Sequence, residues 1–217
     1  MYVYQDPTEG LRKARMHPFI AVRPGEAGFV DFKSHPERIP EALEDFVAHA
    51  HEPAVQTFYH FLAWLNGHDS FLESCDCALR GPESHRFKYS KRKLCAHGRL
   101  MLMHRDLAAN CDDRFNLLYN ALGRSLTSID PEFLRVHGLV GLAPSRALFE
   151  DLLPAHANVD GYVSRFGDAG RGYQVTLVFK AFGNDAGETF ANLDRVFKNI
   201  EAACRGTSKC LQALKTE

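Results

Sequence analysis

The pattern of apolar and polar positions along the chain predicts five helices. In the longer ones, apolar residues recur three and four positions apart, the spacing of one face of an amphipathic helix. Ser34 is a candidate N-cap for the helix predicted over 34–50, and Asn66-Gly67 is a stop signal for the helix predicted over 52–67. A shorter helix fits between Ser145 and Pro154. The predicted helices span residues 34–50, 52–67, 112–126, 145–154 and 188–204.

Alternation of apolar and polar residues, the period of a half-buried strand, predicts strands in the remaining segments. The clearest is a hairpin whose two strands flank the glycine-rich turn GDAGRG; Tyr173, Val175, Leu177 and Phe179 form one face of its second strand. The predicted hairpins span residues 18–34 and 158–183, and the predicted single strands span 72–80, 94–104 and 136–144.

Segment 94–104 fits two structures. Its leucine, methionine and alanine residues favour a helix, whereas Gly98 in mid-segment and the alternation of Phe87 and Tyr89 before it favour a strand. We predict a strand, and the helix stays open as the alternative.

The order of these elements predicts an α+β fold, a single-domain sandwich in which helices pack on a mainly antiparallel sheet, because adjacent hairpins prevail over crossovers. No repeat, low-complexity tract or long linker divides the chain. Residues 1–217 are therefore expected to form one domain, with residues 1–17 as a candidate flexible arm.

The segment between the predicted strand 94–104 and the next helix contains HRDLAANCDDRF. The order of elements around it resembles that of the acetyl-coenzyme A-dependent N-acyltransferase superfamily. The resemblance implies a glycine-rich loop at this place, whose bare amides cradle a pyrophosphate. This chain has no glycine there, and Asp112 with Asp113 would repel phosphate. The resemblance thus implies a degenerate acyltransferase-type domain.

Charge composition narrows the choice of partners. Lysine and arginine number 26 and aspartate and glutamate 27, so no global field attracts nucleic acid or an acidic membrane surface. We therefore expect no nucleic acid and no membrane partner, whereas a small-molecule ligand, a protein partner or a second copy of the chain stays open. The most basic stretch, His85 to Lys93, fits a solvated loop or strand edge, or a phosphate or single-strand site.

The compartment follows from the apolar segments and the cysteines. No segment supplies the roughly twenty apolar residues that cross a bilayer, and the N-terminus lacks the apolar core of a signal peptide. Six cysteines over this length are too few for a secreted disulfide scaffold. The expectation is a cytoplasmic protein whose cysteines are thiols.

Two pairs of residues, Cys75 with Cys77 and Cys95 with His97, form the centre of the candidate metal site. If 72–80 and 94–104 are neighbouring strands, period-two geometry places each pair on one face, and opposed pairs offer three sulfurs and an imidazole. Such a set suits zinc or iron, although structural zinc sites usually space their cysteines further apart. Two further histidines are candidate ligands nearby. The candidate ligands are Cys75, Cys77, Cys95, His97, His85 and His104.

The same cysteines have a plainer interpretation, since free cysteine is among the residues most often buried as a small hydrophobe. Asp76 and Glu73, which lie beside them, are candidate general acid and base groups if they line a pocket. The first hypothesis is an enzyme of small-molecule metabolism with a metal- or thiol-based site near 72–80 and 94–104. The second is a non-catalytic ligand-binding or accessory protein with buried structural cysteines; the third is the degenerate acyltransferase-type domain.

Overall fold

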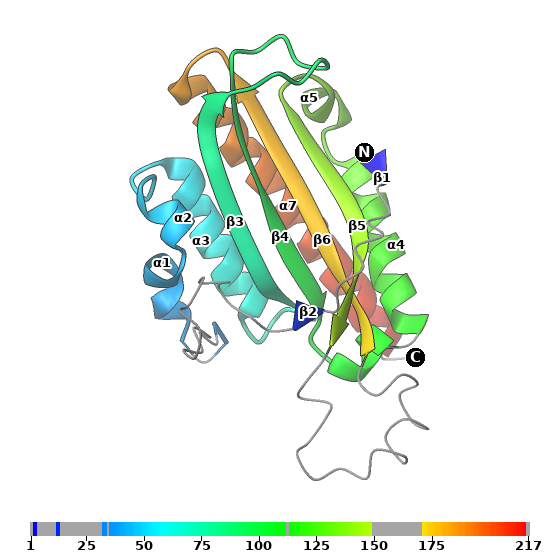
Figure 1. Cartoon of the computed structure of the whole chain (residues 1–217). Helices are drawn as coiled ribbons and strands as arrows, with labels where there is room; N and C mark the ends of the chain where they lie inside the picture. The colour runs from blue at the N-terminus through cyan, green and yellow to red at the C-terminus, as the bar shows by residue number, and fades with distance from the viewer. Residues whose placement is uncertain are drawn as a thin grey trace.

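Four long antiparallel strands form the centre of the fold (Figure 1). They are β3 (Leu72–Ser84), β4 (Leu94–His104), β5 (Gly138–Leu148) and β6 (Arg171–Gly183), in the spatial order β5-β6-β4-β3. The computed structural model describes residues 2–3, 12–13, 32–33, 35–111, 113–148 and 171–215. Within the predicted arm, β1 (Tyr2–Val3) and β2 (Arg12–Lys13) pair parallel with β5.

Three helices, α3 (Pro53–Asn66), α4 (Asp113–Ser128) and α7 (Ala186–Lys215), lie against one face of this sheet (Figure 1). All three follow the predicted amphipathic patterns, and α7 continues beyond the predicted end at 204. The architecture is the predicted α+β class, with helices packed on an antiparallel sheet. No helix in the described part of the chain is both long enough and apolar enough to cross a membrane.

The core lies between this helical layer and the strands. Alternate strand residues such as Leu100 and Leu177, which are register partners on β4 and β6, are buried in it. Their neighbours one position along project to the opposite side of the sheet, because side chains alternate along a strand. We call that side the second face; it carries Met101, Thr176 and Lys180.

Two irregularities interrupt β3. Ser74 pairs with Leu102 while Asp76 pairs with Met101, so Cys75 is an extra residue in a β-bulge. A second register shift lies between Arg80 and Glu83. The ambiguous segment 94–104 is a strand, as predicted, and it is hydrogen-bonded to neighbours on both sides.

The predicted continuous helix over 34–50 is wrong. The chain instead forms a short 3₁₀ helix, η1 (Pro36–Arg38), followed by α1 (Ile39–Ala42) and α2 (Glu44–Val47). Pro40 has no N–H to continue the helical ladder, and Leu43 leaves the helical region with φ −98° and ψ 73°. The break still buries Ile39, Leu43 and Phe46, whereas Val47, predicted on the apolar face, is 55% exposed.

The predicted helix over 145–154 is also wrong where the structure describes it. Residues 145–148 continue β5 past Pro144, and Ser145 caps no helix. Ser145 Oγ instead lies 3.0 Å from Thr176 Oγ1 on β6, so pairing with β6 overrides the local helical pattern. A short helix that the pattern did not predict, α5 (Pro131–Val136), comes directly before β5.

Several predictions concern residues outside the described ranges. They are the hairpin over 18–34 apart from its last residues, residues 149–154, and the first strand and turn of the hairpin over 158–183. The second strand of that hairpin is β6, and it is confirmed: Val175, Leu177 and Phe179 are buried on the helical face.

Candidate functional site

The two cysteines of segment 72–80 lie on opposite faces of the sheet. Cys77 is buried in the core against the helices. Cys75 donates its Sγ–H to Oε1 of Gln174 at 3.0 Å. Gln174 lies on the second face of the sheet, because the next residue of β6, Val175, faces the core. The predicted common face is wrong because the bulge at Cys75 shifts the alternation by one residue.

Cys95 and His97 do share a face of β4, as strand geometry predicted, but they lie far from Cys75. Cys75 lies beside Met101, and Met101 is six positions along the strand from Cys95, about 20 Å at the usual rise. His97 Nε2 is 3.0 Å from Oε1 of Glu83. The sulfur and imidazole groups therefore do not converge as the metal hypothesis requires.

The two further candidate ligands are separated as well. His85 stacks on Phe87 in the loop after β3, with ring centroids 5.2 Å apart. His104 lies at the other end of β4, where its Nδ1 accepts a hydrogen bond from the backbone N–H of Asp106 at 3.0 Å. Among the described residues, no group of three or more His, Cys, Asp or Glu side chains is placed to hold a metal ion.

Burial sets the protonation state of the core thiols. Desolvation raises the pKa of Cys95 to about 11, and it raises the pKa values of Cys77 and Cys204 well above the ordinary range. The thiolate is the nucleophile and the metal ligand, so these cysteines are neutral near pH 7. Their environment favours packing over thiol chemistry.

Thiol labelling tests this environment. We expect Ellman's reagent at about pH 7.5 to modify exposed Cys210 first and to reach Cys77, Cys95 and Cys204 only on unfolding, because thiolate fraction and access govern the rate. Cys210→Ser should remove the fast phase, and Cys204→Ser should leave it intact. Rapid native-state modification of Cys77 or Cys95, located by peptide mass spectrometry, would contradict this prediction.

The two candidate acid–base carboxylates each meet a cation. Glu73 is 1% exposed and forms an ion pair with Lys33, and Asp76 Oδ2 lies 2.7 Å from Nε of Arg99. Their acid–base role stays a prediction.

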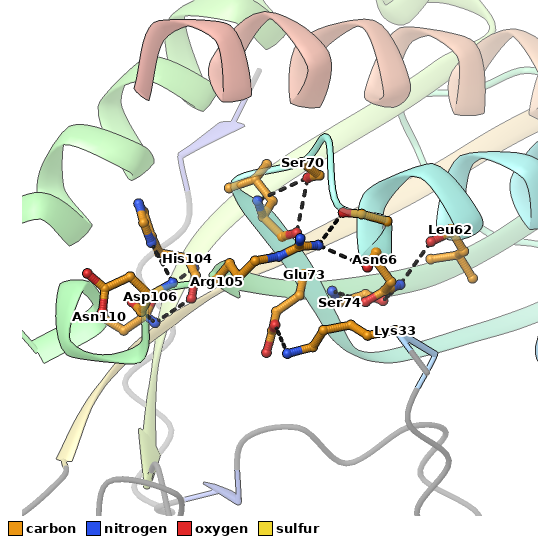
Figure 2. A network of polar contacts seen from close by, with 12 residues as sticks. Lys33, Leu62, Asn66, Ser70, Glu73, Ser74, His104, Arg105, Asp106 and Asn110 are labelled. Carbon is orange, nitrogen blue, oxygen red and sulfur yellow. Dashed lines mark hydrogen bonds and ion pairs between the residues drawn. The ribbon is translucent and has the colours of Figure 1, made fainter. Parts of the chain in front are cut away.

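A polar cluster joins the C-terminal end of α3 to the adjoining ends of β3 and β4 (Figure 2). Asn66 donates from Nδ2 to Ser74 Oγ at 2.7 Å, and its Oδ1 accepts from the Ser74 N–H at 3.1 Å. The Arg105 guanidinium donates to the backbone carbonyls of Asn66 and Gly67, which end α3. Helix-end carbonyls need such partners, so this cluster stabilises the junction.

Asn110, in the turn that follows β4, extends the cluster (Figure 2). Its Oδ1 accepts from the backbone N–H of His104, and its Nδ2 donates to the backbone carbonyl of His104, both at 2.8 Å. Asn110 is fully buried, so this paired contact fixes the turn after β4. His104 is thus held in a structural turn.

The most distinctive surface lies at the other end of the sheet, where residues 85–93 connect β3 to β4. We call these residues the 85–93 loop. The ring of Phe87 stacks on Tyr89 at 5.4 Å, and both rings contact Phe182, at the end of β6, edge-on. The loop is thereby packed against the sheet through aromatic contacts.

Lys180 of β6 contacts two rings of this aromatic cluster. Its Nζ lies 3.7 Å from the centroid of the Phe87 ring and donates to the hydroxyl oxygen of Tyr89 at 3.0 Å. Nearby, Arg92 forms an ion pair with Glu188 at 2.9 Å, which ties the loop to the start of α7. Cation–π and hydrogen-bond contacts together hold the loop on its support.

The cations that anchor the loop leave others facing solvent. Arg86, Lys88, Lys91 and Lys93 are exposed, and none of them forms an ion pair with another described residue. The Tyr89 side chain is 57% exposed beside them. The result is a basic surface with an exposed aromatic ring.

The sequence pointed to the loop but not to its support. The run His85 to Lys93, with its interleaved aromatics, is visible as a basic stretch. Lys180 and Phe182 lie about ninety positions further along the chain. In β6 they alternate with the core residues Phe179 and Ala181, which places both of them on the second face. Pairing of β4 with β6 brings them under the loop.

Comparisons with protein-family models, with curated proteins and with solved structures found no match for this chain.

Proposed function

We propose that this protein is a non-catalytic binding protein that takes up an anionic partner on the 85–93 loop. The observation that carries the proposal is a group of exposed cations, Arg86, Lys88, Lys91 and Lys93, which form no ion pair with another described residue and lie on a loop anchored by aromatic packing. An anchored loop loses less conformational entropy on binding than a mobile one.

The near-neutral composition does not oppose this proposal. The net charge of −1 is a sum over the whole chain, whereas electrostatic attraction at short range depends on local charge. Glu188, the carboxylate that contacts the loop, is already paired with Arg92. The loop therefore presents a positive local field to an approaching anion.

The placement of the thiols favours a non-catalytic protein over a thiol- or metal-based enzyme. Cys77 and Cys95 lie on opposite faces of the sheet and are buried, and burial raises their pKa values. Each behaves as a small apolar residue within the packing. This supports the second sequence hypothesis, in which the cysteines are structural.

Charge reversal on the loop tests the proposal. We expect the double variant Lys88→Glu/Lys91→Glu to bind fluorescein-labelled heparin about tenfold more weakly than the unmodified protein at low salt, because each reversal replaces an attraction with a repulsion. The measurement is a fluorescence anisotropy titration at about 50 mM salt.

Arg124→Glu/Lys209→Glu is the matched control, with the same change in net charge. Both residues are exposed on helices, and Lys209 lies towards the end of α7 remote from Glu188. The control should bind as the unmodified protein does. Equal losses in both variants, or no heparin binding by the unmodified protein, would rule out the loop as an anion site.

A further inference from the structure

From the same surface we infer a partner class, single-stranded nucleic acid, with bases stacking on Tyr89 and phosphates lying along the cations of the loop and the adjoining sheet. This inference rests on the proposed function and deepens it, and it replaces the expectation of no nucleic acid partner, which rested on the net charge of the whole chain. Proteins that bind single strands without sequence preference combine a basic track with exposed aromatic rings on which bases stack. Both features occur together here.

The aromatic part of the surface is preorganised. Tyr89 packs against Phe87 with an interplanar angle of 18°, and its hydroxyl accepts a hydrogen bond from Lys180 at 3.0 Å. Phe182 contacts the same ring edge-on at 5.9 Å. With 57% of the residue still exposed, the ring is fixed by the protein yet accessible from solvent. A base can therefore stack on it without first ordering the side chain.

The basic part continues from the loop onto the second face of the sheet. Strand register places two cations, Arg80 and Lys180, in one row across β3, β4 and β6, on either side of His97, which contacts Glu83. Lys180 in this row is the residue that contacts Phe87 and Tyr89. The row thus joins the loop cations to a surface on which a nucleic acid backbone can lie.

The exposed ring distinguishes a single strand from other anions. A duplex or an acidic peptide is attracted by the cations alone, since paired bases are not available to stack and carboxylates carry no extended π face. Unpaired bases gain both the charge contacts and the stacking contact. The combination of features therefore favours a single strand over the other polyanions.

The test compares probes and ring variants by fluorescence anisotropy of the full-length protein. The probes are a labelled twelve-residue oligothymidylate, a twelve-base-pair duplex and polyglutamate. We expect the single strand to bind most tightly, and Tyr89→Ala to weaken its binding by about five- to a hundredfold, the usual range for losing one stacked base. Tyr89→Phe keeps the ring and should stay within about twofold of the unmodified protein.

Tyr173→Ala is the matched control, because Tyr173 is a partly exposed tyrosine near the opposite end of β6 that stacks on Phe115. It should leave oligothymidylate binding unchanged, and thermal unfolding should show that each variant folds. Lys88→Glu/Lys91→Glu should also lower the dependence of affinity on salt by about 1.4 units of the log–log slope, since two phosphate contacts are lost.

The outcomes separate this inference from the proposed function. The single-strand inference would be overturned, leaving a general anion site, if all three probes bound equally, Tyr89→Ala left the affinity unchanged and Lys88→Glu/Lys91→Glu lowered it. Tighter binding of polyglutamate would also overturn it and would indicate an acidic protein partner. No binding of any probe would overturn both proposals.

Discussion

Phe58→Ala should destabilise the protein by about 3–5 kcal/mol, the usual cost of emptying a buried aromatic site. Phe58 is fully buried at the point where α3 meets α2, α7 and β6. Its ring lies 5.0 Å from that of Phe46, 4.5 Å from that of Phe197 and 6.4 Å from that of Phe179. Truncation removes these three contacts and a fourth with Phe61 at 6.1 Å, and it leaves a cavity that rigid neighbours cannot fill.

Urea denaturation monitored by circular dichroism measures this loss. Domains of this kind are stable by about 5–15 kcal/mol, so the variant should lose about a fifth or more of its stability or fail to fold at all. Leu117→Ala is the control, because Leu117 is 49% exposed on α4 and its removal should change the free energy of unfolding by less than about 0.5 kcal/mol. A decrease in the free energy of unfolding for Phe58→Ala as small as that for Leu117→Ala would contradict this packing of Phe58 in the core.

Gly98→Ala should destabilise the protein by about 1–3 kcal/mol or more through overpacking. Gly98 on β4 is the register partner of Phe179 on β6. A Cβ at this position would overlap the backbone carbonyl oxygen of Ala78 on β3 and would lie 2.7 Å from Cζ of Phe179. The backbone of β3 cannot move away without breaking its pairing with β4, so the sheet and the core are both disturbed.

Gly206→Ala is the matched control, with the opposite expected sign. Gly206 is exposed on α7, and a Cβ there would meet only Ser125 Oγ at an ordinary 3.7 Å. Alanine is the better helix former, so this change should stabilise the protein by about 0.5–1 kcal/mol. Urea denaturation of both variants checks the pair; a Gly98→Ala variant as stable as the unmodified protein would mean that β4 is not packed under Phe179.

The candidate metal site shows how a local pattern fails when the sheet is irregular. Period-two alternation placed Cys75 and Cys77 together because it assumed an uninterrupted ladder. The bulge at Cys75 adds one residue to β3 and sends the two side chains to opposite faces. Nothing in the sequence LESCDC marks the bulge, since it depends on how β3 aligns with β4.

The anion surface shows the complementary case. The basic and aromatic residues of the 85–93 loop were visible in the sequence, but they fitted a solvated loop as well as a binding surface. Lys180 and Phe182 decide between a loose and an anchored loop, and strand pairing alone brings them to it.

The spacing of apolar residues within each segment was enough to predict the α+β class, the helices α3, α4 and α7, and strand β6, whereas it left β4 open between a strand and a helix. Contacts between segments remote in the chain produce the extension of β5 through residues 145–148, the separation of the cysteines and the support of the 85–93 loop. Each of these depends on pairing or packing between segments remote in the chain, and such contacts outweigh local preference when they bury more surface and satisfy more backbone hydrogen bonds.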